Sequence, residues 1–235
     1  MVDENEKYRE LFNNLDPNDP DYLDYFISLI NQVLIDRNIF VQSSDNNDKR
    51  LEFYDILRDV LSKMPHTRIE FIASGHSSLT FKIDDKGLKI GKSAIDTKKN
   101  RKSFPCLIPV FVDECHKIDD REYYTLQVTP YVDTLDIADE DVYSTYKKLR
   151  DLGYIWNDPT LANTGRIIKD IDYNGHHYKK GDLVIIDLED IAYVGLEETS
   201  DEIMEEIAIS SYNGNVYKFE TRYAEEKRKG ISKWH

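Results

Sequence analysis

LRDLGYIWNDPTLAN at residues 149–163 and LVIIDLED at residues 183–190 are the stretches around which the chain is organised. Asp158 stands five residues before Asn163, and an apolar run leads directly to Asp187. A carboxylate at the end of a buried strand is costly unless a cation or hydrogen-bond donors meet it. Carboxylate and amide oxygens are hard ligands of the kind that Mg²⁺ takes alongside phosphate oxygens. The two stretches therefore predict a site for Mg²⁺ and a phosphorylated ligand.

The chain is rich in Asp and Asn, so this spacing taken alone can also arise by chance, and the flanking features have to decide. Asp139 or Asp141 can cap a helix that runs to residue 152 and stops at Gly153. That helix would place residues 154–158 directly after it. Residues 166–168 and 183–186 are predicted to pair as strands around a turn at residues 174 and 175, which would bring Asp187 near Asn163.

Composition narrows the possible functions. The 235 residues carry a net charge of −14, which argues against a broad nucleic-acid-binding surface. The first residues have neither a basic region nor an apolar core, so we expect no signal peptide, and no apolar run reaches the roughly 18 residues that suggest a membrane span. Cys106 and Cys115 form no metal-ligand pattern. We expect a cytoplasmic protein with reduced thiols, bound to neither membrane nor nucleic acid.

Residues 1–65 are predicted to form a helical extension. Asp19 before Pro20 is expected to cap a helix whose apolar positions repeat at helical spacing from residue 22 to residue 34. A polar loop at residues 43–48 separates it from a second amphipathic helix at residues 51–61. These helices carry no recognisable chemistry. We expect them to pack as a bundle on the lobe that follows, and a partner-binding module is the alternative.

Residues 66–132 change to the period of two that is typical of strands. Two alternating runs flank a small-residue turn that contains Gly75 and Ser77, and a second turn at residues 84–87 leads into a third strand around Lys89. Such a turn can bring backbone N–H groups onto phosphates, although ordinary hairpin chemistry also explains it. Lys89 lies between two apolar residues and can contact phosphate or face solvent, and Lys92 is the second choice for the phosphate contact.

Two further strands are predicted at residues 108–111 and 123–128. Thr129 precedes a proline, which favours extended backbone there. We expect a hinge at Val128 and Thr129, where backbone groups could meet the edge of an adenine. Residues 133–235 would form the remaining lobe, with tail helices at residues 200–209 and 217–229 whose charged residues we interpret as solvated faces.

Taken together, residues 68–190 resemble the protein-kinase-like superfamily in a minimal bacterial-type form. Protein kinases have a loop in which a base Asp, four intervening residues and a metal-binding Asn are followed by a further metal-binding Asp. The resemblance implies an α+β, two-lobed fold with a small antiparallel β lobe, a reduced and mainly helical second lobe and the helical extension. It implies ATP and Mg²⁺ as cofactors, with Asp158 as the catalytic base and Asn163 and Asp187 as the metal ligands. Lys89, Gly75 and Ser77 would then contact phosphates.

The sequence also departs from the protein-kinase pattern. Trp156 and Asn157 stand where protein kinases have His-Arg, and Thr160 stands where serine/threonine kinases have a lysine. Glu189 replaces the glycine of Asp-Phe-Gly, a feature similar to the aminoglycoside phosphotransferases. No Glu lies between Lys89 and residue 109 to pair with the lysine, so Glu52 or Glu70 could substitute.

Three functions follow. The first is phosphoryl transfer from Mg²⁺-ATP to a hydroxyl on a protein or small molecule. The second is an inactive nucleotide-binding pseudokinase that acts as a scaffold or regulator through its N-terminal helices. The third is an acidic interaction protein without a nucleotide site.

Overall fold

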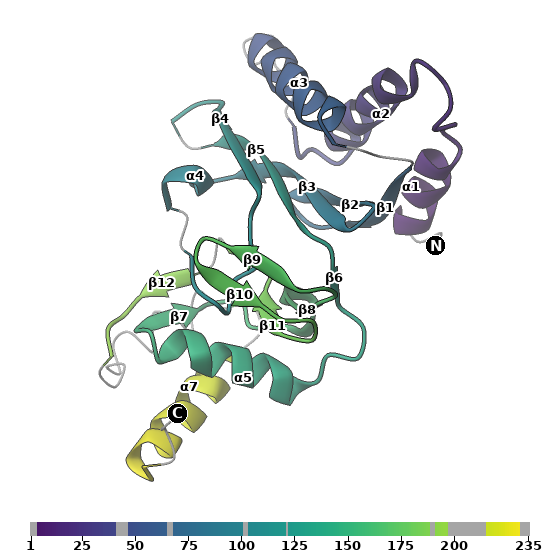
Figure 1. Ribbon diagram of the computed structural model, residues 1–235. Helices are drawn as coiled ribbons and strands as arrows, with labels where there is room; N and C mark the ends of the chain where they lie inside the picture. The colour runs from purple at the N-terminus through teal and green to yellow at the C-terminus, as the bar shows by residue number, and fades with distance from the viewer. Residues whose placement is uncertain are drawn as a thin grey trace. The chain divides into compact units, whose positions relative to one another are not determined.

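The computed structural model describes residues 4–40, 47–64, 68–100, 103–120, 122–188, 191–196 and 215–230. The chain is of mixed α+β class with an antiparallel sheet, as the sequence predicts at this level (Figure 1). It divides into two compact units. The first comprises Met1–Arg101 and Pro109–Tyr131, and the second comprises Lys102–Ile108 and Val132–His235.

A five-stranded sheet with the order β1-β2-β3-β5-β4 forms the centre of the first unit, and every neighbouring pair is antiparallel. Its predicted first three strands and the strand at residue 123 are confirmed. The strands are β1 (Ile69–Ser74), β2 (Ser78–Ile83), β3 (Lys86–Ser93), β4 (Val112–Lys117) and β5 (Tyr123–Pro130).

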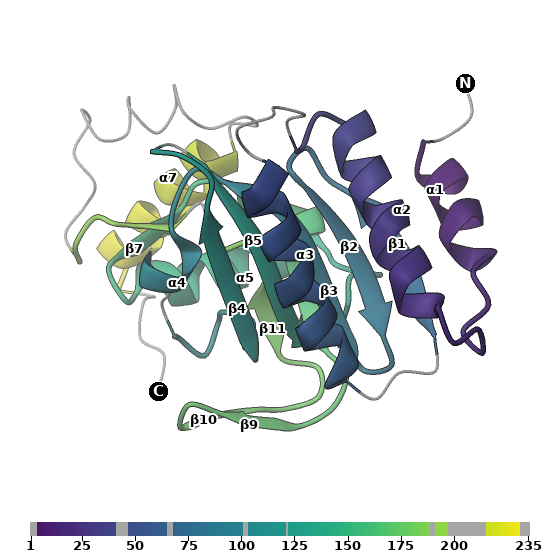
Figure 2. The ribbon, with the colours of Figure 1, turned by 90° about the horizontal axis from the view of Figure 1, so that it is seen from above.

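One face of this sheet is apolar and is covered by α1 (Glu4–Asn13), α2 (Tyr22–Asp36) and α3 (Asn47–Ser62) (Figure 2). Aromatic rings join the two layers: Phe12 stacks on Phe71 at 5.6 Å, and Phe26 meets Phe81 edge-on at 5.1 Å between centroids. Each fully buried aromatic side chain contributes roughly 1.5–3 kcal/mol. The helices and this sheet therefore share one hydrophobic core, as the expected packing of the bundle requires.

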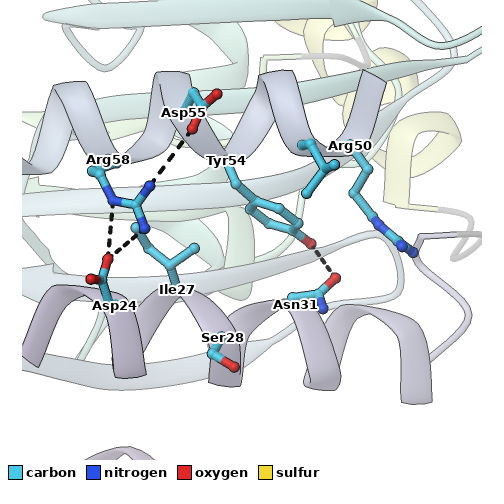
Figure 3. Close-up of a pocket in the computed structure, with 9 residues that line it drawn as sticks. Asp24, Ile27, Ser28, Asn31, Arg50, Tyr54, Asp55 and Arg58 are labelled. Atoms are coloured by element: carbon cyan, nitrogen blue, oxygen red, sulfur yellow. Dashed lines mark hydrogen bonds and ion pairs between the residues drawn. The ribbon is translucent and has the colours of Figure 1, made fainter. Parts of the chain in front are cut away.

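A groove of about 250 Å³ runs between α2 and α3 (Figure 3). Arg58 spans it with an ion pair to Asp24 on α2, and the hydroxyl of Tyr54 donates a 2.8 Å hydrogen bond to Asn31. Burial raises the pKa of Tyr54, so this hydroxyl remains a donor at neutral pH. The two helices are thus held together by polar side chains along their outer edge as well as by the core.

Several predicted boundaries differ from the structure. Helix α2 begins at Tyr22, not after Asp19, because the carboxylate of Asp19 accepts the N–H of Asp21 and its carbonyl accepts the N–H of Tyr22, which closes a turn before the helix. The loop expected at residues 43–48 ends before Asn47, because α3 already includes Asn47 and Asp48.

The predicted strand at residues 108–111 is wrong, because β4 begins only at Val112. The N–H of Ile108 donates to Ile185 within the second unit, and the N–H of Phe111 donates to Val128 of β5 just before the β4 ladder. The apolar run that suggested a strand therefore carries the chain between units. Strand β4 itself is mostly polar, which hid it in the sequence.

The second unit contains α5 (Asp139–Arg150), α7 (Asn215–Arg228) and several short strands (Figure 1). The predicted strand pair is confirmed as β8 (Thr164–Ile167) with β11 (Leu183–Ile185), to which β6 (Val132–Asp133) adds an edge. The turn at Asn174 and Gly175 closes a separate hairpin, β9 (Ile171–Tyr173) with β10 (His176–Tyr178), inserted between them. Both turn residues have positive φ, as a two-residue hairpin turn requires.

Short strands are as prominent as helices in the described residues of this unit, which differs from the mainly helical lobe that the resemblance implies. The predicted helix before the loop is confirmed as α5, and the second tail helix as α7. The first tail helix, predicted at residues 200–209, lies outside the described residues. Within the described part of the chain, no helix has the length and apolar character that a membrane span needs.

Candidate functional site

The loop after β7 (Tyr154–Trp156) carries Asp158 and is held by the strand before it. Strand β7 pairs antiparallel with β12 (Ile191–Tyr193), and Trp156 is fully buried in the core of the second unit. The large apolar side chain two residues before Asp158 therefore anchors the start of the loop. Trp156, which stands where protein kinases have a histidine, therefore has a packing role here.

Asp158 and Asn163 contact each other directly. The Asn163 side-chain amide donates to the Asp158 carboxylate at 2.7 Å and to the Asp158 carbonyl at 3.2 Å. A single 3-10 turn, η2 (Leu161–Asn163), closes the loop between them, and the hydroxyl of Thr164 donates to the carbonyl of Thr160 at 3.0 Å. The five-residue spacing is thus the length of the loop that this turn closes, and the side chains of Asp158 and Asn163 meet across the loop.

Asp187 follows from the β8–β11 pairing. Asn163 immediately precedes β8, and its carbonyl accepts the N–H of Ile186 at 3.0 Å. The backbone of Asp187 therefore lies one residue from that hydrogen bond, and its side chain is half-buried. The structure brings Asp158, Asn163 and Asp187 to one end of this strand pair.

The donor set of these three residues fits Mg²⁺. Among the described residues, the hydrogen bonds of the Asn163 side chain use its NH₂ group, so its Oδ1 remains available as a ligand. No three His, Cys, Asp or Glu side chains gather at metal-binding distance within the described ranges. Mg²⁺ is commonly held by one or two carboxylates with phosphate oxygens and water completing its shell, so a set of this size is sufficient. Glu189 and Asp190 lie outside the described residues.

A groove of about 370 Å³ lies beside the loop in the same unit. Residues that follow Asp158 form one wall, and the first turns of α5 and α7 form the other. Among the described residues that line it, Asp139 is the only ionisable one, and the side chain of Asn215 donates to the Pro159 carbonyl at 3.2 Å. The lining residues are Asp139, Val142, Pro159, Thr160, Leu161, Ala162, Asn215 and Phe219.

The other candidate residues lie in the first unit. Lys89 stands in the middle of β3, opposite Thr80 on one side and Gln127 on the other. These neighbours share the sheet face that the helices do not cover, since cross-strand partners point to the same side. Lys92, the competing lysine, is paired with Glu122 at 3.1 Å.

The carboxylates suggested as substitutes for a helix glutamate have other neighbours. Glu52 lies 3.2 Å from the ring of His116, and Glu70 stands opposite Lys82 in the β1–β2 register. The helix that follows β3, α4 (Thr97–Asn100), is only four residues long.

Gly75 and Ser77 lie in the turn between β1 and β2, which is stabilised from within. The Gly75 N–H donates to the carbonyl of Ser78 at 2.8 Å, and the Ser77 carbonyl accepts the N–H of Lys92 at 2.9 Å. Gly91 permits this close approach, because a Cβ there would lie 2.1 Å from the Ser77 carbonyl. The Gly75 donor is therefore used by the turn itself.

Val128 and Thr129 lie inside β5 and not at its end. The side chain of Val128 is buried in the core shared with the helices, and its carbonyl accepts the N–H of Phe111 at 2.7 Å. Thr129 stands opposite Gly87 of β3, on the polar face. Ladder pairing thus occupies the backbone at the expected hinge.

Sequence reasoning missed Asp113, a buried acid of β4 on this same polar face. The missed strand hid it. The residues around it, from Val112 to Lys117, are mostly polar, so the strand was not recognised. The strand register shows that Asp113 and Lys89 both stand opposite Gln127.

A scan against models of known protein families finds no match for this chain, and a search of curated proteins finds no relative.

Proposed function

We propose that this protein is a Mg²⁺- and ATP-dependent phosphotransferase of the two-lobed, kinase-like kind, acting in the cytoplasm. The observation that carries the proposal is the Asp158–Asn163 hydrogen bond at 2.7 Å, next to the strand pair that ends at Asp187. The two half-buried acids and the amide lie together at the end of one strand pair. A bound cation and phosphate would meet all three.

Each residue has a stated role in this proposal. Asn163 and Asp187 hold Mg²⁺, which neutralises charge on the phosphate oxygens. Asp158 orients the acceptor hydroxyl and takes its proton as the oxygen attacks the γ-phosphorus and ADP leaves. Lys89 contacts the phosphates of the nucleotide, and Gly75 and Ser77 border them. Such catalysis consists mostly of positioning and electrostatic stabilisation. The acceptor is a hydroxyl on a protein or a small molecule.

A pseudokinase is the second candidate, and two observations favour it. Helix α4 is short and lacks a glutamate, and the N–H of Gly75 is already bonded within its turn. In this case the chain would bind nucleotide without turnover and act through α1–α3. The α2–α3 groove exposes Leu51, and the charged residues Asp55 and Arg58 also line it (Figure 3).

Nucleotide binding is tested by thermal unfolding with and without Mg²⁺-ATP. A ligand bound only to the folded state at a hundredfold excess over Kd adds about 2.7 kcal/mol of stability. For a chain of this size, that raises the midpoint by about 5–10 °C. Asp187→Asn should abolish the Mg²⁺-dependent part of the shift, whereas Asp172→Asn, at an exposed hairpin position, should leave it intact. An equal shift in Asp187→Asn and wild type would refute the metal site.

Turnover separates the two candidates. Conversion of ATP to ADP with hydroxyl acceptors should fall by about 100-fold or more in Asp158→Asn, because general base catalysis contributes on that scale. Mg²⁺-ATP binding should persist in that variant. If the wild type binds Mg²⁺-ATP and Asp158→Asn turns over equally fast, Asp158 is not the base. Binding without any turnover in the wild type would favour the pseudokinase.

A further inference from the structure

Asp113 is a buried acid whose hydrogen-bond partners among the described residues are neutral. Only 6 % of the residue is exposed, and its Oδ1 accepts the Thr97 hydroxyl at 3.0 Å and the Gln127 side-chain amide at 3.3 Å. Among the described residues, no ion pair to Asp113 is present within 4.0 Å. An ionised carboxylate taken out of water is costly unless positive charge or strong donors compensate it. Two neutral donors supply part of that compensation, so a nearby cation would stabilise the ionised carboxylate further.

The sheet register places a lysine, Lys89, in the same row as Asp113. Asp113 stands opposite Gln127, and Gln127 stands opposite Lys89, so the three residues form one row across β4, β5 and β3. Cross-strand partners share a face, so all three side chains rise from the polar side of the sheet. Two strand spacings separate the ends of the row by about 10 Å at the backbone. The flexible four-carbon stem of a lysine can shorten the remaining distance, and Gln127 is the residue between Asp113 and Lys89 in the row.

Gln127 can join the two charges because an amide is both donor and acceptor. Its NH₂ group donates to Asp113, and its Oε1 can accept from an ammonium on its other side. The far end of the row is fixed by α4. Thr97 of that helix donates to Asp113, and Lys98 pairs with Glu114 of β4 at 3.2 Å. Helix α4 thus binds the Asp113 carboxylate to the sheet, although α4 itself contains no acidic residue.

We propose that Asp113, acting through Gln127, is the carboxylate that positions Lys89. It would do in a strand what a helix glutamate does in protein kinases, and its effect on nucleotide binding rests on the proposed function above. Asp113 is a positioning residue, since it contacts the lysine's neighbour and not the ligand.

A double-mutant cycle without nucleotide tests the pairing. Lys89→Met removes the cation, and Asp113→Asn removes the charge while keeping an oxygen for Thr97. Each single substitution should lower the midpoint of thermal unfolding. If Lys89 and Asp113 are coupled, the double variant should lose about 3 °C less than the sum of the two single losses. Gln127→Leu should reduce this shortfall. Lys92→Met with Asp113→Asn is the matched control and should be additive, since Lys92 is paired with Glu122. An additive Lys89–Asp113 cycle would overturn the proposal.

The second readout is the Kd of Mg²⁺-ATP, which a purely structural role of Asp113 would not change in the folded protein. Asp113→Asn should raise this Kd by about tenfold, and adding it to Lys89→Met should raise it no further. An unchanged Kd in a folded Asp113→Asn variant would overturn the positioning role. If the wild type shows the coupling but binds no Mg²⁺-ATP, the proposed function fails while the Asp113–Lys89 pairing stands.

Discussion

Arg150 and Glu220 are the most deeply buried pair of opposite charges in the described part of the second unit. Their side chains are 0 % and 5 % exposed, and Arg150 Nε donates to Glu220 at 2.9 Å. The Tyr146 hydroxyl donates to the same carboxylate at 2.5 Å, and Arg150 also donates to the Gly195 carbonyl at 2.6 Å. Burial, and then the charge of Glu220, raise the pKa of Tyr146 well above its usual value, so the hydroxyl keeps its proton. The cluster joins α5 to α7.

Replacing Glu220 with alanine should therefore destabilise the protein strongly. The substitution leaves a buried guanidinium without its partner, and breaking such a pair costs about 3–5 kcal/mol. Glu225→Ala, on the same helix at a more exposed position, should change the free energy of unfolding by less than about 0.5 kcal/mol. Urea unfolding of both variants measures the difference. Equal stabilities would show that the buried pair contributes nothing.

Helices α5 and α7 are also joined by a partly exposed set of charges. Arg222 binds Glu140 with two hydrogen bonds, at 2.6 and 2.7 Å, and Lys147 binds Glu226 at 2.6 Å. The Arg222 hydrogen bond lowers the pKa of Glu140. Burial raises the pKa of Glu226, but hydrogen bonds from Lys147 and Arg222 outweigh it and lower the pKa overall. Glu226 is thus not simply part of a solvated helix face, as the sequence suggests.

This arrangement predicts loss of stability in acid. A carboxyl with a lowered folded pKa stabilises the protein above its unfolded value, here 4.5, and this stability is lost as the pH falls through the folded value. Arg222→Met should flatten that loss between pH 5 and about pH 3. Lys229→Met, at a side chain that is 65 % exposed just after α7, should leave this acid profile unchanged. The midpoint of thermal unfolding, measured across this pH range, reports the loss of stability in acid. Identical acid profiles for wild type and Arg222→Met would contradict the prediction.

At the scale of the whole molecule, the chain enters the second unit twice. Residues 102–108 belong to it although the strands before and after them belong to the first unit. Ile185 of β11 donates to the carbonyl of Cys106 at 2.8 Å and accepts the N–H of Ile108 at 3.0 Å. The short segment thus completes the edge of β11, and burial around it raises the pKa of the Cys106 thiol to about 12.

A fragment that begins at residue 132 should therefore be less stable than one that also carries residues 103–108 on a flexible linker. Without the segment, Ile185 has an unpaired N–H and carbonyl, and each such group costs about 1–3 kcal/mol when buried. Hydrogen exchange of the Ile185 amide in the two fragments measures the effect. A linked segment with Ile108 replaced by proline, which lacks the N–H, is the control and should restore less protection. Equal protection with and without the segment would contradict this assignment.

The sequence by itself determined the elements whose signals are local. Apolar periodicity predicted α2, α3, α5 and most strands of the first sheet, because side chains repeat on one face with the period of the element. The turn at Asn174 and Gly175 was predictable because few residues accept positive φ. Asp158 and Asn163 were predictable as neighbours because only one short turn separates them. Their roles in phosphoryl transfer stay a prediction.

The tertiary structure alone decided which distant residues meet. Strand β4 was missed because its side chains are mostly polar, and the row of Asp113, Gln127 and Lys89 depends on the register of three strands. Arg150 and Glu220 are 70 residues apart, and nothing in their local sequence marks them as a buried pair. Pairing of this kind is fixed when strands and helices pack, since register and packing decide which side chains share a face. A linear pattern carries no such information.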